Sequence, residues 1–327
     1  MHKILITRFC LCALLVGCGE DPDTTASWEH SYTSLFDAEI SNDGRFAVVS
    51  SFNDGASFWD FFANSRLYDW RHDDSDDSQV ANIAFAPNSS HVITANGRTF
   101  VVWDVKTGKS TGYWDVDTDI TDVALSNDGE YILLGLKDDR AIHINQKTGR
   151  RLEVVAHRNE RVVCVDLSPD GAIAATGGND GRVIIWNTVT GDELHILEHG
   201  ARIAITEFDL AYQRLFIADE RGGATIWDLT TGERITDLKL GAHQQVITAA
   251  RFSSDGTRLL LGFPGRDVRL IDSANGRLLK TWRTPMRTHG WIPQGSTVYA
   301  AAFNDNESSI VAESSNGLAR AWAVGSN

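Results

Sequence analysis

The chain has 327 residues, a formal net charge of −14 and a pI near 5.1, and 42% of its residues are hydrophobic. That length and composition are typical of a folded domain with a sizeable core. An acidic chain without a basic stripe does not attract nucleic acid through its overall field, so we expect no nucleic-acid partner.

The first seventeen residues have the pattern of a secretory signal peptide, with a basic start and an apolar run that is too short to be a transmembrane helix. The run ends in Leu15-Val16-Gly17-Cys18, which resembles the bacterial lipobox. The resemblance implies cleavage before Cys18, a lipid on its thiol and, because Gly19 follows, an outer-membrane location. An ordinary signal peptide with an incidental cysteine is the alternative.

Residues 18–26 are then expected to form a lipidated tether, and residues 27–327 a single domain facing the periplasm, with exposure on the cell surface as an alternative. The first predicted strand, Ser27 to Tyr32, has no repeat of its own.

Only one cysteine, Cys164, lies in the domain, inside an apolar strand. We therefore expect a buried thiol, no disulfide within the domain and no cysteine metal site.

The rest of the chain repeats. A Trp-Asp pair or a variant of it closes each unit, at residues 59–60, 103–104, 144–145, 186–187, 227–228, 271–272 and 322–323. A Ser-x-Asp-Gly turn precedes most of these pairs, as at 41–44, and a Thr-Gly turn follows most of them, as at 107–108. Such turns supply the positive φ that tight hairpins need. Three markers in register predict seven units of short strands.

Four tryptophans, Trp28, Trp70, Trp114 and Trp282, fall where fourth strands are expected, so we predict that their side chains are partly exposed.

The most complete unit spans residues 156–187 and contains His157, Thr176, Asp180 and Trp186. It resembles the repeat of the WD40 (Trp-Asp repeat) β-propeller family. The resemblance implies a buried relay: the histidine bridges the aspartate and the threonine hydroxyl, which reaches the indole N–H. It also implies an all-β, seven-bladed propeller whose ring is closed by the N-terminal strand joining the last blade. A catalytic triad is the alternative for the four residues, but no exposed nucleophile is indicated.

The markers define two faces of the propeller. The Ser-x-Asp-Gly and Thr-Gly turns form one face, here called the turn face, and the variable segments between blades form the other, the loop face. Three loop-face segments stand out: residues 69–78 with Asp73, Asp74, Asp76 and Asp77; residues 115–119 with Asp115, Asp117 and Asp119; and the insertion at residues 283–296 with Met286, Arg287, Trp291 and Ile292.

The insertion is the strongest candidate for partner binding, because tryptophan and arginine are enriched at binding hot spots. Packing of Trp291 over a blade edge is the alternative. The aspartates at 73–77 are expected to steer a basic partner, or simply to form a solvated surface. The aspartates at 115, 117 and 119 have the spacing that opens a calcium loop but lack its glycine and glutamate, so they are a weak metal candidate and we expect no metal.

These observations predict a non-enzymatic interaction scaffold, lipid-anchored in the bacterial cell envelope, with an envelope or periplasmic protein as its partner. The chain has no Gly-x-Ser-x-Gly elbow and no His-Glu-x-x-His motif, and we expect no cofactor. The alternative is a periplasmic enzyme or small-ligand binder that uses the central channel, as quinoprotein-like propellers do. A deep pocket with convergent titratable groups would favour that alternative.

Overall fold

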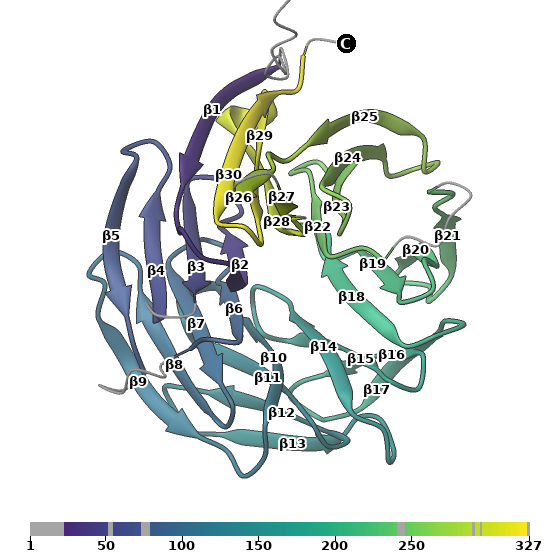
Figure 1. Cartoon of the computed structure of the whole chain (residues 1–327). Coiled ribbons are helices and arrows are strands. Elements are labelled where there is room, and N and C mark those ends of the chain that lie inside the picture. The colour runs from purple at the N-terminus through teal and green to yellow at the C-terminus, as the bar shows by residue number, and fades with distance from the viewer. Residues whose placement is uncertain are drawn as a thin grey trace, which may run out of the picture.

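The computed structural model describes residues 23–51, 55–72, 79–240, 246–289, 292–294 and 296–325. The chain forms seven four-stranded antiparallel sheets arranged in a ring, as the blades of a β-propeller (Figure 1). The predicted seven-bladed, all-β architecture is confirmed. In the described part of the chain, no helix is long and apolar enough to cross a membrane.

Blades 1 to 6 each place their strands in chain order from the axis to the rim. Blades 1 to 3 comprise β2 (Leu35–Ile40), β3 (Phe46–Ser51), β4 (Gly55–Asp60) and β5 (Ser65–Trp70); β6 (Asn82–Phe85), β7 (His91–Asn96), β8 (Thr99–Asp104) and β9 (Ser110–Asp115); and β10 (Ile120–Leu125), the 3-10 turn η1 (Asn127–Gly129), β11 (Tyr131–Leu136), β12 (Arg140–Asn145) and β13 (Arg151–Val155). Blades 4 to 6 comprise β14 (Val162–Leu167), β15 (Ile173–Gly178), β16 (Arg182–Asn187) and β17 (Glu193–Glu198); β18 (Ile203–Phe208), β19 (Arg214–Asp219), β20 (Ala224–Asp228) and β21 (Arg234–Asp237); and β22 (Ala249–Phe252), β23 (Arg258–Gly262), β24 (Asp267–Asp272) and β25 (Leu278–Arg283).

Blade 7 closes the ring with strands from both ends of the chain. It consists of β28 (Val298–Asn304), the 3-10 turn η2 (Asp305–Glu307), β29 (Ser309–Ser314), β30 (Leu318–Ala323) and, at the rim, β1 (Thr24–Glu29). β1 pairs antiparallel with β30, from Thr24 opposite Trp322 to Glu29 opposite Leu318 (Figure 1). This pairing confirms the predicted closure and covers what would otherwise be an open sheet edge.

The boundary predicted for the closing strand was wrong. The strand begins at Thr24 and ends at Glu29, rather than running from Ser27 to Tyr32. Residues 24–26 were predicted to belong to the tether. They belong to the ring, because the pairing of β1 with β30 extends to Thr24 opposite Trp322. The insertion forms a two-stranded hairpin, β26 (Arg287–His289) and β27 (Ile292–Gln294), between blades 6 and 7.

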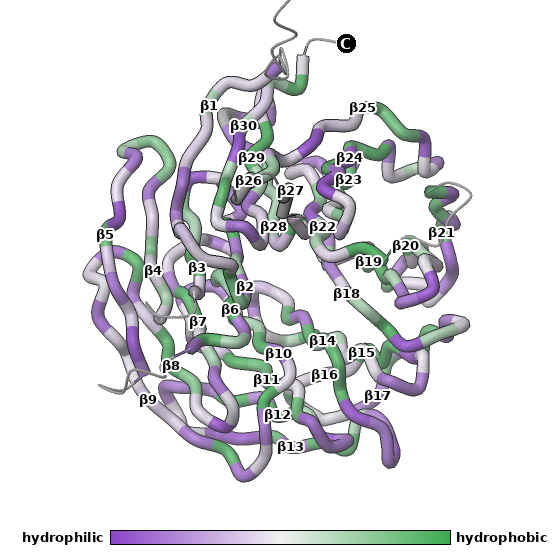
Figure 2. The backbone as a smooth tube through the Cα atoms, viewed as in Figure 1, coloured by the Kyte–Doolittle hydropathy of each residue, from purple (hydrophilic) through white to green (hydrophobic). Residues whose placement is uncertain are grey.

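The core lies between neighbouring blades. Middle strands such as β16 are buried along most of their length, whereas rim strands such as β13 alternate between half-buried and exposed residues. Figure 2 shows hydrophobic residues along strands such as β11 and hydrophilic ones in the outer turns. The Cys164 thiol is buried as predicted, and burial raises its pKa to about 12.

Two of the four rim tryptophans contradict the prediction of partial exposure. Trp70 and Trp282 are buried, at 2% and 1% exposed. Each ring packs against the closing tryptophan of the next blade: Trp70 stacks on Trp103 at 5.0 Å between ring centroids, and Trp282 lies 6.5 Å from Trp322. The neighbouring blade therefore covers a residue that the position at the rim would leave exposed.

Candidate functional site

The four predicted relay residues are joined by hydrogen bonds inside blade 4. His157 Nδ1 lies 3.0 Å from Asp180 Oδ1, and its Nε2 lies 3.2 Å from the Thr176 hydroxyl. Trp186 Nε1 donates to the same hydroxyl at 3.3 Å. His157 and Thr176 have no exposed surface, so the bonds satisfy polar groups that would otherwise be costly to bury. A hydroxyl that substrate cannot reach is not placed for nucleophilic catalysis.

A second complete relay, which we did not predict, lies in blade 5. His199 Nδ1 lies 3.2 Å from Asp219, its Nε2 lies 2.7 Å from the Thr225 hydroxyl, and Trp227 donates to that hydroxyl at 2.8 Å. Blade 2 holds a shorter version made of His72, Thr94 and Trp103. A histidine ahead of the inner strand, together with the closing tryptophan, is the sequence pattern that would have identified both.

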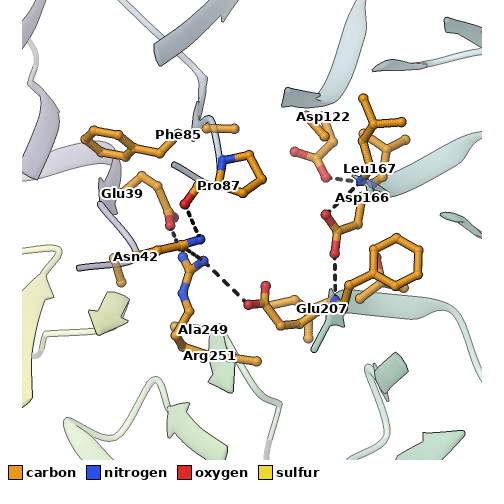
Figure 3. Close-up of a pocket in the computed structure, with 18 of the residues that line it drawn as sticks. Glu39, Asn42, Phe85, Pro87, Asp122, Asp166, Leu167, Glu207, Ala249 and Arg251 are labelled. Atoms are coloured by element: carbon orange, nitrogen blue, oxygen red, sulfur yellow. Dashed lines mark hydrogen bonds and ion pairs between the residues drawn. The ribbon is translucent and has the colours of Figure 1, made fainter. Parts of the chain in front are cut away.

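The inner strands of all seven blades surround a cavity of about 190 Å³. Figure 3 shows that charged side chains from different blades point into it. They are Glu39 of β2, Asp122 of β10, Asp166 of β14, Glu207 of β18 and Arg251 of β22. The channel therefore has the convergent titratable groups by which the small-ligand alternative can be recognised.

Sequence reasoning missed this cluster, although a pattern marks it. Glu39, Asp166, Glu207 and Arg251 each stand two residues before the turn that follows the inner strand. Equivalent positions in a closed ring lie at the same height around the axis, so charges about 40 residues apart meet in the channel.

Two channel aspartates join neighbouring blades. Asp122 Oδ2 accepts a hydrogen bond from the backbone N–H of Val165 in the next blade at 2.8 Å, and Asp166 Oδ2 accepts one from Phe208 N–H at 2.8 Å. Burial raises the pKa of Asp122 to about 7 and that of Asp166 to about 6, although the backbone hydrogen bonds pull both values down. These two carboxyls therefore hold neighbouring blades together, and burial brings their pKa values close to neutral pH.

Arg251 is the single cation among the described residues that line the cavity. Its Nη2 lies 2.5 Å from Glu39 Oε1, and its Nη1 lies 3.5 Å from Glu207 Oε1 and donates to the Asn42 side chain (Figure 3). Burial raises the pKa of Glu207 to about 8 in spite of the lowering effect of Arg251. One guanidinium therefore links blades 1, 5 and 6 across the axis of the ring.

A second cavity, of about 260 Å³, adjoins the channel on the turn face. Both cavities are lined by Asn42, Leu210 and Arg251, so the guanidinium lies where the channel meets that face. The channel therefore offers several carboxyl groups and one guanidinium to a small polar ligand.

The structure describes only part of the predicted partner-binding set. Cys18, Trp291 and the acidic residues Asp73, Asp74, Asp76 and Asp77 lie outside the described residues. Ile292 begins β27, and Met286 is 46% exposed. Arg287 is engaged within the chain: its guanidinium donates to Ser31 O at 2.7 Å and pairs with Glu29 at 2.8 Å. These contacts attach the insertion to the segment around the closing strand, so the Arg287 guanidinium is already engaged within the chain.

The weak metal candidate does not form a cluster. Asp117 pairs with Arg140 at 2.9 Å and Asp119 with Lys137 at 3.0 Å, while Asp115 ends β9. Across the described ranges, no group of three or more His, Cys, Asp or Glu side chains is placed to hold a metal ion.

Comparison with protein families identifies a matching region in blade 4. The model of the WD40 family, described as "WD domain, G-beta repeat", matches residues 149–187. The match covers β13 to β16 and includes all four relay residues of blade 4.

Proposed function

Because this chain is a WD40-repeat β-propeller, we propose that it is a non-enzymatic scaffold that binds a partner protein on its loop face. The fold alone does not identify a partner, so the proposal rests on the residues exposed on the loop face. The main support for this proposal is an insertion whose base is held by hydrogen bonds on the loop face, beside exposed apolar side chains.

The base of the insertion is fixed by hydrogen bonds to the turns of blades 6 and 7. Thr284 N–H donates to Arg266 O at 2.9 Å, and the Asn316 side chain donates to Pro285 O at 3.1 Å. Next to this base, Tyr32 is 84% exposed and Met286 is 46% exposed. Aromatic and methionine side chains are enriched at the centres of protein interfaces, so this surface is suited to partner binding.

Trp291→Ala is expected to weaken partner binding by about 2 kcal/mol or more and to leave the melting temperature nearly unchanged. The measurement is affinity capture of the full chain from its own membranes, followed by quantification of the captured partner. Tyr113→Ala is the matched control, since Tyr113 is an exposed aromatic of the rim strand β9, at 52% exposed. A lower melting temperature with intact capture would show that Trp291 is a packing residue.

We also propose that the aspartates at 73, 74, 76 and 77 steer a basic region of the partner towards the same face. Long-range attraction of this kind is screened by salt. Capture should therefore weaken as the ionic strength is raised.

The proposed location is the cell envelope, with the scaffold anchored to the outer membrane by a lipid on Cys18. Cys18→Ser is expected to abolish lipidation and to release the protein from membranes. Metabolic labelling with a radioactive fatty acid and membrane fractionation measure both effects. Cys12→Ser, a change within the signal peptide, is the control and should keep the label. A Cys18→Ser chain that still sediments with salt-washed membranes would contradict the anchor.

The channel favours a second candidate function, the binding of a small ligand. The specific observation is a cavity of about 190 Å³ into which carboxyls of four blades point. Its carboxyl groups favour a small polar ligand that donates hydrogen bonds. Native mass spectrometry and the absorbance spectrum of the purified protein distinguish the two functions, because a ligand that copurifies in the channel would support this candidate.

A further inference from the structure

The turn between β23 and β24 contains a backbone conformation that is unusual for its residue. Arg266 has a φ of +74°, directly before the first residue of β24. The equivalent positions in blades 4 and 7 are glycines, Gly181 at +79° and Gly317 at +75°. A side chain is disfavoured in this region and glycine is not, so the backbone conformation by itself does not favour an arginine here. Such an outlier points to a role for the side chain.

Arg266 belongs to a group of arginines that few carboxylates offset. Burial lowers the pKa of the Arg266 guanidinium, and the nearby charges of Arg283 and Arg320 lower it further, whereas the charge of Asp267 raises it. Asp267 is shared, because its carboxylate pairs with Arg283 at 2.9 Å and with Arg269 at 3.0 Å. We call Arg266, Arg283 and Arg320 the arginine patch. It is a local positive region in a chain of net charge −14.

Arg320 extends the patch across the boundary between blades 6 and 7. It lies two residues before Trp322 on β30, so both side chains project from the same side of the strand. Trp322 packs against Val268 and Trp282 of blade 6, which directs Arg320 towards the same blade. Its Nε is buried and has no hydrogen-bond partner among the described residues. A buried donor without a partner is costly unless a ligand satisfies it.

The patch adjoins the base of the insertion. Arg266 Nε donates to Thr284 O at 2.9 Å, and Arg283 is the last residue of β25, directly before Thr284. Tyr32 and Met286 also lie near this base, because Met286 is two residues after Thr284 and Arg287 donates to Tyr32 O at 3.4 Å. The loop face therefore carries the guanidinium groups of the arginine patch and the exposed side chains of Tyr32 and Met286 beside the base of the same insertion.

We propose that the arginine patch binds an acidic, extended segment of the partner protein, whose apolar residues contact Tyr32 and Met286. This inference rests on the proposed scaffold function and specifies the chemistry of its partner. Guanidinium groups form paired hydrogen bonds with carboxylates, which suits glutamate and aspartate side chains. A nucleic acid would be repelled by the net negative charge of the whole chain, whereas a short acidic segment can dock on a local positive patch. The acidic segment at 69–78, on blade 1, would then attract a different, basic part of the same partner.

The test uses the full chain and a fluorescein-labelled peptide, Glu-Glu-Leu-Glu-Glu-Leu-Glu-Glu, with a control peptide in which glutamine replaces every glutamate. Fluorescence anisotropy should show binding of the acidic peptide only. Arg266→Gly should weaken it about tenfold, as expected for the loss of a charge-assisted hydrogen bond. The same change relieves the positive φ but loses the hydrogen bond to Thr284 O, so the melting temperature should stay within about 3 °C of that of the unchanged chain. If Arg266 were kept only for structure, Arg266→Gly would lower the melting temperature and leave peptide binding unchanged.

Two further variants keep the proposal falsifiable. Arg320→Gln removes a second cation without changing the turn and should weaken the acidic peptide similarly. Arg221→Ala, in the corresponding turn of blade 5, is the matched control and should bind normally. Equal binding of the glutamine peptide, displacement by inorganic phosphate at the same concentration, or normal binding by Arg266→Gly would each overturn the inference.

Failure of this inference can be told apart from failure of the proposed function. Capture of the partner that is lost in Trp291→Ala but kept in Arg266→Gly would overturn the arginine patch alone. Capture that survives Trp291→Ala would count against the proposed use of the insertion, and the peptide measurement would still decide the patch.

Discussion

Removal of residues 24–32 is expected to open the ring, so that the chain aggregates or loses a large part of the roughly 5–15 kcal/mol by which folded domains are stable. The deletion takes away all of β1 and leaves the backbone edge of β30 exposed. It also removes His30, whose Nδ1 lies 2.7 Å from Glu313 Oε2 in a pair with almost no exposed surface. Chemical denaturation and size-exclusion chromatography measure the loss.

The matched control is a chain that starts at Asp23, which keeps β1 and should remain monomeric and stable. Within the full chain, His30→Ala isolates the buried pair. It leaves the Glu313 carboxylate without its partner and should cost about 3–5 kcal/mol, while His30→Ala combined with Glu313→Ala should cost less. A shortened chain without residues 24–32 that is monomeric and equally stable would rule out closure by β1.

Arg251→Met is expected to destabilise the propeller by about 3–5 kcal/mol, because it leaves the carboxyls of Glu39 and Glu207 in the channel without their cation. The measurement is the midpoint of urea denaturation. Arg202→Met is the control, since Arg202 pairs with Glu220 on the surface, where loss of a salt bridge has little effect. Similar small losses in both variants would contradict a central role for Arg251.

The pH dependence provides a readout that a simple packing defect would not change. Asp122 and Glu207 have pKa values of about 7 and 8 in the folded protein, above their ordinary values of 3.8 and 4.5. The folded state therefore holds extra protons, and stability is lost as pH rises towards these values. His143, whose pKa burial lowers to about 4, acts in the opposite direction, but only up to its ordinary value of 6.5. The melting temperature should thus fall between pH 6.5 and 8, and fall more steeply in Arg251→Met. A flat profile in both proteins would contradict the channel electrostatics.

The amino-acid sequence by itself determined the number of blades, their turns and the closure of the ring. These features depend on local chemistry that recurs along the chain: the glycine of each tight turn needs a positive φ, and the closing tryptophan needs a buried partner. The same local pattern located the blade 4 relay around His157 but not the end of the closing strand, because Thr24 pairs with Trp322 from the opposite end of the chain.

Only the tertiary structure decided which charges meet. Glu39 and Arg251 are 212 residues apart and pair because ring closure brings the inner strands of blades 1 and 6 to one axis. Arg266 and Arg320 likewise come from different blades, and their charges interact only after the blades pack. Trp70 and Trp282 are buried for the same reason, since the neighbouring blade covers them. Local turn chemistry fixes each blade, whereas burial and electrostatics depend on residues that approach each other only when the blades pack and the ring closes.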